Sequence, residues 1–205
     1  LSKFMKFIVK TMNEIILASK SKVRKKILNT NGIYCEVFPS NIDEDSVKNS
    51  LLKQNASPEI ISKNLAELKA NKISTKFIDK IVIGADSVID LEGKIISKPT
   101  NRKEALDILK LLNGKPHYLI SSVCISKGGN MIWNYTDKAE LFMKEFKLEE
   151  LENYLSKLSD ESLYAYNVYQ IEGIGEALFS EIKGDKDTIM GLPVKKIKLY
   201  LKNLN

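Results

Sequence analysis

Asp86 and Lys98 are the two side chains of this 205-residue chain whose types and spacing best suit joint chemistry. The stretch from Ile81 to Pro99 reads as a buried strand that ends in a carboxylate, then a hairpin that returns a lysine in front of a proline. A carboxylate at the carboxyl edge of a sheet can hold Mg²⁺, orient water or accept its proton. Together the residues indicate a nucleotide hydrolase, although an aspartate after a strand is often only a turn former.

A second polar group lies in the turn that follows the first apolar segment. Ser19 and Ser21 stand at the end of a strand predicted over residues 14–19, and Arg24 lies one turn into the helix predicted next. The first backbone N–H groups of a helix lack partners within it and bind anions. We interpret this turn as a phosphate site; the alternative is an ordinary serine cap before a solvated basic helix face.

Three other polar residues are weaker candidates. Glu36 interrupts an apolar strand and Lys69 lies near the end of a predicted helix, so each can equally belong to a surface ion pair. His117, the only histidine, has no neighbouring nucleophile or second ligand and reads as a structural residue. The sequence contains no GxxxxGK[ST], GxSxG, HExxH or EF-hand pattern, which disfavours those chemistries.

Composition narrows the class of protein further. The net charge of +6 attracts anions in general, but aromatic residues are not interleaved with a basic stripe, so no specific nucleic-acid partner is expected. No apolar run approaches the roughly 20 residues that cross a bilayer, so no membrane partner is expected. Cys35 and Cys124 lack metal-knuckle spacing and indicate a reducing compartment. We therefore expect a cytoplasmic protein.

Strand and helix periodicities alternate along the chain. Helical spacing is found at residues 20–30, 42–71, 101–112, 148–158 and 194–204. Strand-like segments are found at residues 14–19, 33–39, 80–86, 118–126, 131–146, 168–173 and 177–185. Ser57 before Pro58, and Asn101 three residues before Glu104, predict helix starts. The pattern predicts an α/β protein with a mixed sheet, with residues 1–13 as an extension and residues 14–205 as a single domain.

Three blocks of this chain occur in an order that resembles the Maf family of nucleotide pyrophosphatases. LASKSKVRKKIL resembles the family's LASxSPRRxxLL, GADSVIDLEGKIISKP its GADTVV…G…KP, and GDKDTIMGLPVKKI its closing G…VVGLP helix. The blocks extend from Leu17 to about Leu201. The resemblance implies a mixed-sheet α/β fold of two lobes around a deep cleft, similar to that of inosine triphosphatases. It also implies a homodimer that hydrolyses a nucleoside triphosphate to a monophosphate and diphosphate.

The resemblance also carries residue roles. It implies that Asp86 is the catalytic aspartate and that a divalent cation, Mg²⁺ or Mn²⁺, is held by Asp86 and Glu36. It implies substrate-binding roles for Ser19, Ser21, Arg24, Glu36, Lys69 and Lys98. Three positions that bear on base choice in the family are Val23, Ser87 and Glu172. A carboxylate accepts hydrogen bonds from guanine N–H groups and not from a uracil carbonyl, so Glu172 favours the branch that acts on 7-methyl-GTP.

Two departures from the family keep other functions open. Lys22 stands where the family has proline, and Tyr166-Asn167 stands where it has an Ala-Gly pair, a change that can weaken the pocket. The first alternative is therefore a basic binding module for nucleic acid or a division partner that has lost catalysis. The second is a housekeeping hydrolase for non-standard purine triphosphates.

Overall fold

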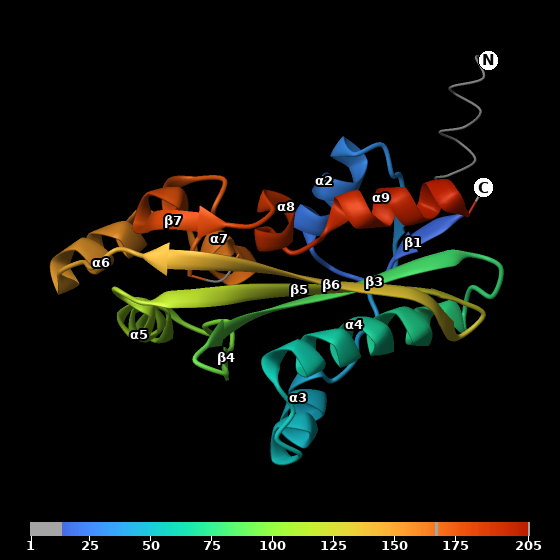
Figure 1. Cartoon of the computed structure of the whole chain (residues 1–205), viewed down its shortest axis with the longest axis horizontal. Coiled ribbons are helices and arrows are strands. Elements are labelled where there is room, and N and C mark those ends of the chain that lie inside the picture. The colour runs from blue at the N-terminus through green and yellow to red at the C-terminus, as the bar shows by residue number, and fades with distance from the viewer. Residues whose placement is uncertain (1–13, 167, 205) are drawn as a thin grey trace.

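One mixed sheet of seven strands runs through the part of the chain that this computed structural model describes, residues 14–166 and 168–204 with the side chains of 164–166 excepted (Figure 1). Its strands are β1 (Ile15–Leu17), β2 (Glu36–Val37), β3 (Ile81–Leu91), β4 (Lys94–Ile96), β5 (Pro116–Lys127), β6 (Asn130–Met143) and β7 (Phe179–Lys183). Their order is β2-β1-β3-β5-β6-β7, with β4 paired to β3 beside this path. β1 pairs in parallel with β2 and β3, and every other pairing is antiparallel. The predicted mixed-sheet α/β class is confirmed.

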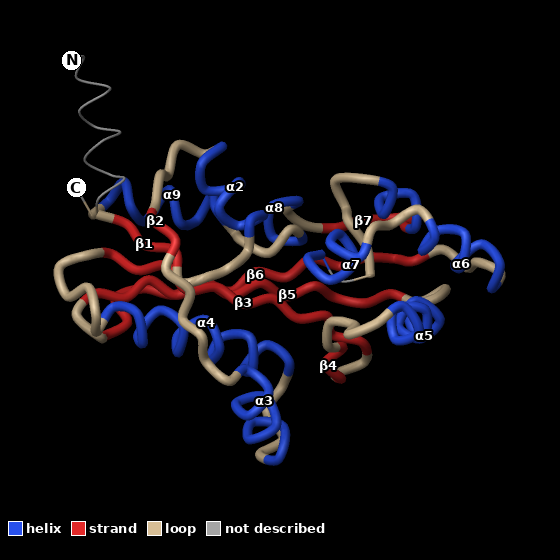
Figure 2. The backbone as a smooth tube through the Cα atoms, turned by 180° about the vertical axis from the view of Figure 1, so that it is seen from behind, coloured by secondary structure: helices blue, strands red, loops and turns tan. Residues whose placement is uncertain are grey.

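Helices cover both faces of the sheet. They are α2 (Lys22–Thr30), α3 (Glu44–Lys53), α4 (Pro58–Ser74), α5 (Arg102–Leu112), α6 (Leu148–Ser156), α7 (Asp160–Tyr166), α8 (Lys186–Ile189) and α9 (Val194–Asn203), with a short 3₁₀ helix η1 (Ile174–Leu178). Helix α4 lies along one face, whereas α2, α8 and α9 lie along the other, as the front and back views both show (Figures 1 and 2). No helix within the described residues is long and apolar enough to cross a membrane.

The predicted helix starts are confirmed at two caps. Ser57 Oγ accepts the Ile60 N–H at 3.3 Å, directly before the proline that opens α4. Asn101 Oδ1 accepts the Glu104 N–H at 2.9 Å at the start of α5. Each cap satisfies one backbone donor that the first helical turn leaves without a partner, so local sequence sets these boundaries.

Three predicted elements are wrong. The strand predicted over 80–86 does not end at Asp86 but continues to Leu91, so this carboxylate lies in the middle of β3 and not at a carboxyl edge. The helical pattern over 42–71 is two helices, α3 and α4, because Asn55 adopts a left-handed φ of 56° and the residue before Pro58 avoids the helical region. Residues 168–173 are not a strand but turns, in which the Gly173 N–H bonds the Gln170 carbonyl at 3.0 Å. Gly175 lets the chain fold back here, since an added Cβ would lie 2.6 Å from Gln170 N.

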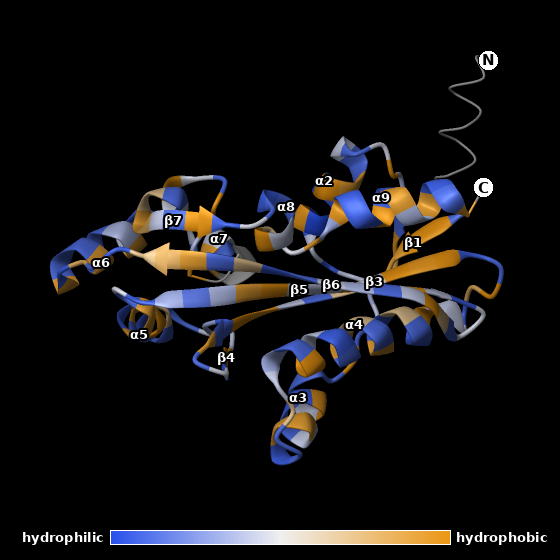
Figure 3. Cartoon of the chain, in the orientation of Figure 1, coloured by the Kyte–Doolittle hydropathy of each residue, from blue (hydrophilic) through white to orange (hydrophobic). Residues whose placement is uncertain are grey.

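The two largest hydrophobic cores of the described chain lie along the one sheet, and polar side chains separate them. One core contains Ile83 of β3 and Val123 of β5, and the other contains Ile89 of β3 and Leu119 of β5. Between them β5 buries Ser121 and its neighbour Ser122. The ribbon is coloured orange over β1 and the adjoining part of β3 and is paler at mid-sheet (Figure 3). The protein therefore has two lobes joined by a continuous sheet.

Helix α4 packs unusually close to β3 because residue 84 is glycine. A Cβ at Gly84 would lie 2.3 Å from the Ala66 carbonyl oxygen and 2.6 Å from the Ala70 nitrogen, which are both backbone atoms of α4. Gly84 and Asp86 point to the same face of β3, since side chains alternate along a strand. The close approach therefore brings Lys69 of α4 toward Asp86.

We predict that Gly84→Ala lowers the free energy of unfolding by about 3 kcal/mol, because the methyl group can be accommodated only if α4 moves away from the sheet. Gly93→Asn in the β3–β4 turn is the matched control, since its φ of 81° suits asparagine and a Cβ there meets nothing within 4 Å. Urea unfolding measures both. Equal, small losses for the two variants would contradict the close-packing argument.

Candidate active site

The pocket opens where β3 lacks a strand on one side. β1 pairs with β3 as far as Ile83, and β4 pairs with it from Ile89 onward. Between these positions, β5 is the only described strand that pairs with β3. Asp86 and Ser87 lie in this gap, and their side chains point to opposite faces because they are adjacent in a strand. The pocket at the gap has a volume of about 950 Å³, and both faces of the sheet contribute to its lining.

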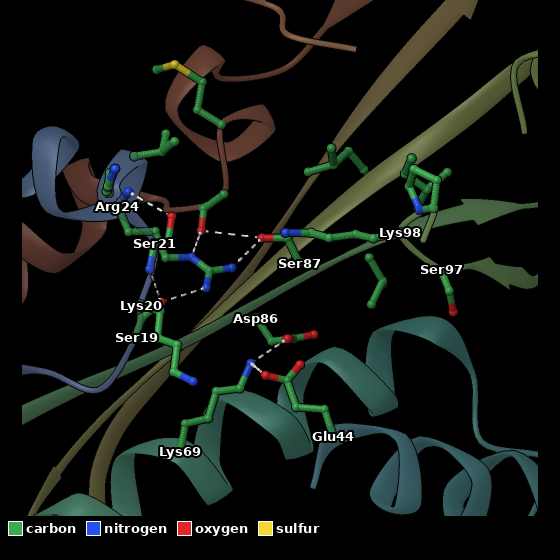
Figure 4. A pocket seen from close by; sticks show the side chains of 18 of the residues that line it. Ser19, Lys20, Ser21, Arg24, Glu44, Lys69, Asp86, Ser87, Ser97 and Lys98 are labelled. Atoms are coloured by element: carbon green, nitrogen blue, oxygen red, sulfur yellow. Dashed lines mark hydrogen bonds and ion pairs between the residues drawn. The ribbon is translucent and has the colours of Figure 1, made fainter. Parts of the chain in front are cut away.

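Lys69 joins two carboxylates on the α4 face (Figure 4). Its Nζ lies 2.9 Å from Asp86 Oδ1 and 3.0 Å from Glu44 Oε1. Lys69 and Asp86 are each 5% exposed, so this ion pair is largely removed from water. Asp86 Oδ2 is buried and has no hydrogen-bond partner in the described part of the chain. A buried carboxylate oxygen that lines a pocket without a partner is suited to hold a water or a cation.

Glu44 is a site residue that sequence reasoning missed. It is the first residue of α3, directly after Asp43, whose side chain caps the helix by accepting the Ser46 N–H at 3.0 Å. An acidic first turn is ordinary at a helix N-terminus, so the sequence carries no separate functional signal here. Burial acts to raise the pKa of Glu44, but Lys69, Lys48 and Arg24 outweigh it and hold that pKa below its ordinary value. The site thus contains a second ionised carboxylate.

Arg24 is held on the opposite face by neutral acceptors. Its Nε donates to the Gly191 carbonyl at 2.9 Å, Nη1 to Ser19 Oγ at 3.2 Å, and Nη2 to Ser87 Oγ at 3.1 Å. Burial lowers the pKa of the guanidinium, and the Asp86 and Glu44 carboxylates raise it, yet arginine stays charged in either case. No acidic group in the described chain forms a salt bridge with Arg24. The guanidinium is therefore available to bind an anion directly.

The serine turn and Lys98 line the same pocket. Ser19 Oγ accepts the Ser21 N–H at 3.2 Å, and Ser21 Oγ accepts the Arg24 N–H at 3.2 Å as the cap of α2. Both hydroxyls thus act as acceptors within the turn, and no hydrogen bond of the described chain uses their protons. Lys98 is exposed at the β4 side. Desolvation by the surrounding protein, followed by repulsion from Arg24, lowers the pKa of Lys98.

Two predicted site residues lie elsewhere. Glu36 is exposed on edge strand β2, pairs with Lys80 at 3.3 Å and does not line the pocket. Glu172 is also exposed and outside the lining, whereas Gln170 is half-buried and inside it. Val23 and Ser87 do line the pocket. Of the sequence-predicted candidates, the structure thus leaves out Glu36 and Glu172 and brings the others together.

The carboxylates present are fewer than a self-sufficient metal site requires. No group of three or more His, Cys, Asp or Glu residues placed to hold a metal ion occurs within residues 14–166 and 168–204. Asp86 Oδ2 and the Glu44 carboxylate are hard oxygen donors that face the same pocket. Mg²⁺ is often bound by one or two carboxylates together with substrate phosphates. The residues present therefore fit a cation that arrives with a phosphorylated ligand, and not one held by protein ligands alone.

His117 is a structural residue beneath the pocket wall, in agreement with its interpretation from the sequence. It is 1% exposed, and its Nε2 lies 3.2 Å from the hydroxyl of Tyr169, which lines the pocket. Burial raises the pKa of Tyr169, so this hydroxyl keeps its proton. Burial lowers the pKa of His117 to about 4. The His117 ring is therefore neutral at neutral pH.

The departure from the family at Tyr166-Asn167 lies outside the residues whose side chains the structure describes.

Fold and site together define a mixed-sheet α/β enzyme whose pocket suits an anionic substrate. A family model described as Maf-like protein matches residues 14–204. The chain belongs to the Maf family, as the resemblance of its three blocks predicted.

Two curated relatives show how close the relationship is. The nucleoside triphosphate pyrophosphatase of Pelagibacter ubique is 74% identical over 191 residues, which are 93% of this chain and 98% of the relative. The 7-methyl-GTP pyrophosphatase of Rhizobium etli is 33% identical over 191 residues, 93% of this chain and 96% of the relative. Among solved structures, the Staphylococcus aureus Ham1 protein matches with a TM-score of 0.45 and 13% identity, covering 94% of this chain and 100% of that chain.

We predict that His117 makes stability pH-dependent. Its pKa is about 4 in the folded protein and 6.5 when unfolded, so between these values the unfolded chain binds the extra proton. Stability therefore falls as the pH is lowered from 6.5 to 4, by about 3 kcal/mol in total, and falls no further from this group below pH 4.

His117→Gln keeps a hydrogen-bonding group for Tyr169 but does not titrate. Urea unfolding across this pH range should show a shallower dependence for the variant than for the parent. Parallel curves for the two proteins would refute the assignment.

Proposed function

We propose that this pocket hydrolyses a nucleoside triphosphate between its α and β phosphates, releasing a nucleoside monophosphate and diphosphate. The observation that carries the proposal is the Asp86 carboxylate. Lys69 holds one of its oxygens at 2.9 Å, and the other is buried in the pocket without a partner. Names of relatives in the same family, such as nucleoside triphosphate pyrophosphatase at 74% identity, agree with this activity.

The phosphate chain would lie against the cations of the pocket. Six cationic and four anionic side chains line it, which leaves a net charge of +2 before any ligand enters. Arg24 has five N–H donors, of which three bind neutral oxygens of the protein, so two are available for phosphate. The hydroxyls of Ser19 and Ser21 add two donors beside it. Lys98 supplies charge from the opposite rim.

Asp86 would orient the attacking water and accept its proton through Oδ2. Because Lys69 fixes Oδ1, the carboxylate cannot rotate freely, which favours a single productive geometry. A divalent cation bound by Asp86 and Glu44 would neutralise charge on the phosphate oxygens when present. In this proposal Glu44 takes the metal-ligand role that the family resemblance had implied for Glu36, because of these two residues only Glu44 lines the pocket.

We predict that Asp86→Asn lowers kcat by about 10²- to 10⁴-fold, because the amide cannot accept the water's proton, while nucleotide affinity changes little. Asp90→Asn is the matched control. It is the same replacement on the same strand, outside the pocket, and its side chain can still accept the Gly93 N–H. A diphosphate-release assay and equilibrium binding measure the two effects. Comparable turnover in Asp86→Asn and the parent would reject the assigned role.

The nucleobase would occupy the apolar end of the pocket. The apolar lining there comes from the second lobe and includes Ile89, Leu119 and Ile171. Gln170 is the half-buried polar residue beside Ile171, and its amide can both donate to and accept from a base edge. We therefore transfer the proposed base-reading role from Glu172 to Gln170, which leaves open whether guanine or 7-methylguanine is preferred.

We predict that Gln170→Ala changes the ratio of kcat/KM between purine and pyrimidine triphosphates by about tenfold, the effect of losing one hydrogen bond of roughly 1.4 kcal/mol. Glu172→Gln, two residues away and exposed, should leave that ratio unchanged. Diphosphate release from GTP, 7-methyl-GTP, ITP, ATP, UTP and dTTP measures both variants. If only Glu172→Gln altered the substrate ranking, the transfer of this role would be mistaken.

The predicted homodimer and cytoplasmic location stay predictions. One observation agrees with a reducing compartment: Cys35 and Cys124 are both buried free thiols, and burial raises the pKa of each to about 11. Such thiols remain protonated and unreactive at neutral pH.

A further inference from the structure

A chain of hydrogen bonds leads from Arg24 into the middle of the sheet. Arg24 Nη2 lies 3.1 Å from Ser87 Oγ, which lies 2.8 Å from Ser121 Oγ. Ser121 Oγ lies 2.7 Å from the Thr188 carbonyl oxygen. Ser121 and Thr188 are fully buried. Ser121 is not a lining residue of the pocket, so a ligand there would not touch it.

The direction of every bond in this chain is determined. A carbonyl oxygen can only accept, so Ser121 gives its one proton to Thr188. Ser121 Oγ must then accept at its 2.8 Å contact, and Ser87 must donate. Ser87 in turn uses its oxygen to accept from the Arg24 guanidinium, which has only donors. Each hydroxyl therefore presents its oxygen toward the cation and its proton away from it.

Without Ser121, the bonds around Ser87 would be weaker. The other acceptor within reach of the Ser87 hydroxyl is the Gly191 carbonyl, at 3.4 Å, a long distance for an O–H···O bond. That carbonyl already accepts Arg24 Nε at 2.9 Å. Ser121 thus gives the Ser87 hydroxyl a close acceptor and keeps its oxygen turned toward Nη2.

The far end of the chain is anchored to the sheet. Thr188 Oγ1 donates to Asp137 Oδ2 of β6 at 2.6 Å. The Thr188 carbonyl also accepts the Gly191 N–H at 3.0 Å, so the residue that receives Ser121 helps to place the carbonyl that receives Arg24 Nε. Two of the three acceptors of the guanidinium, Ser87 Oγ and the Gly191 carbonyl, therefore depend on one buried network.

We propose that Ser121 is a positioning residue for Arg24, one that holds the guanidinium fixed so that its two remaining N–H groups point at the phosphate chain. The inference rests on the proposed function for its effect on catalysis. Small misplacements of a binding group can cost up to about 10²-fold in rate, and an indirect loss of one anchor should cost less. We expect Ser121→Ala to lower kcat/KM about tenfold.

A double-mutant cycle separates positioning from a general structural role. Ser121→Thr keeps the hydroxyl and should restore most of the activity lost in Ser121→Ala. In an Arg24→Lys background, which lacks the planar guanidinium, Ser121→Ala should cause little further loss of kcat/KM, because the two residues act through one contact. Ser126→Ala is the matched control: it removes another fully buried serine hydroxyl of β5, which bonds Asn71 at 2.6 Å outside the pocket lining. Its kcat/KM should match that of the parent.

A second readout is independent of turnover. In ¹H–¹⁵N spectra of the unliganded protein, the Arg24 Nε–H signal, identified by its loss in Arg24→Lys, should exchange slowly with water. Ser121→Ala should make it exchange at least severalfold faster, and Ser126→Ala should not. Thr188→Val, which keeps the side-chain shape but not the bond to Asp137, should also accelerate the exchange. It provides the test of the buried network if Ser121→Ala does not fold.

The outcomes decide between the claims. The positioning role is overturned if Ser121→Ala causes an equal loss of activity in both Arg24 backgrounds. It is also overturned if the Arg24 Nε–H exchanges rapidly in the parent, or if its exchange rate is unchanged in Ser121→Ala and Thr188→Val. If the parent releases diphosphate from no nucleoside triphosphate, the proposed function fails, and the exchange measurement alone still decides whether Ser121 holds Arg24.

Discussion

The interruption of strand pairing along β3 is the constraint on which the site depends. β1 stops pairing at Ile83 because the chain leaves the sheet there for the serine turn, and β4 begins only at Ile89. A longer β1 would cover this edge with backbone. In the gap, side chains from both faces of one strand reach a common space, so Asp86 and Ser87 can contribute to one pocket although they point in opposite directions.

The strand also separates Arg24 from the two carboxylates of the site. Asp86 and Glu44 share Lys69 on the α4 face, whereas Arg24 on the other face bonds only neutral oxygens. A buried ion pair contributes little net stability, because desolvation offsets much of its Coulomb attraction. The arrangement is better explained by function: the carboxylates remain available to water and a cation, and the guanidinium remains available to an anion.

In the proposed function, the two lobes have different tasks in recognition. The lobe that contains α2 would supply hydroxyls and Arg24 for phosphate, and its apolar residues support the turn from behind. The other lobe supplies the apolar wall and Tyr169, which His117 supports from within the core. Polar mid-sheet residues such as Ser121 lie between the cores and connect α8 to β3. Specificity for the base and affinity for the phosphates can therefore vary independently.

Local patterns in the sequence determined the helix caps, the mixed α/β class, the serine turn and the placement of Asp86 at a strand, because each depends on neighbouring residues. Only the tertiary structure decided that Glu44 and not Glu36 faces the pocket, and that Gln170 and not Glu172 lines it. An acidic residue at a helix start or on a two-residue edge strand gives the same local sequence pattern whether its side chain faces a site or solvent. Its direction depends on packing between segments distant in sequence, as the close approach of α4 at Gly84 shows.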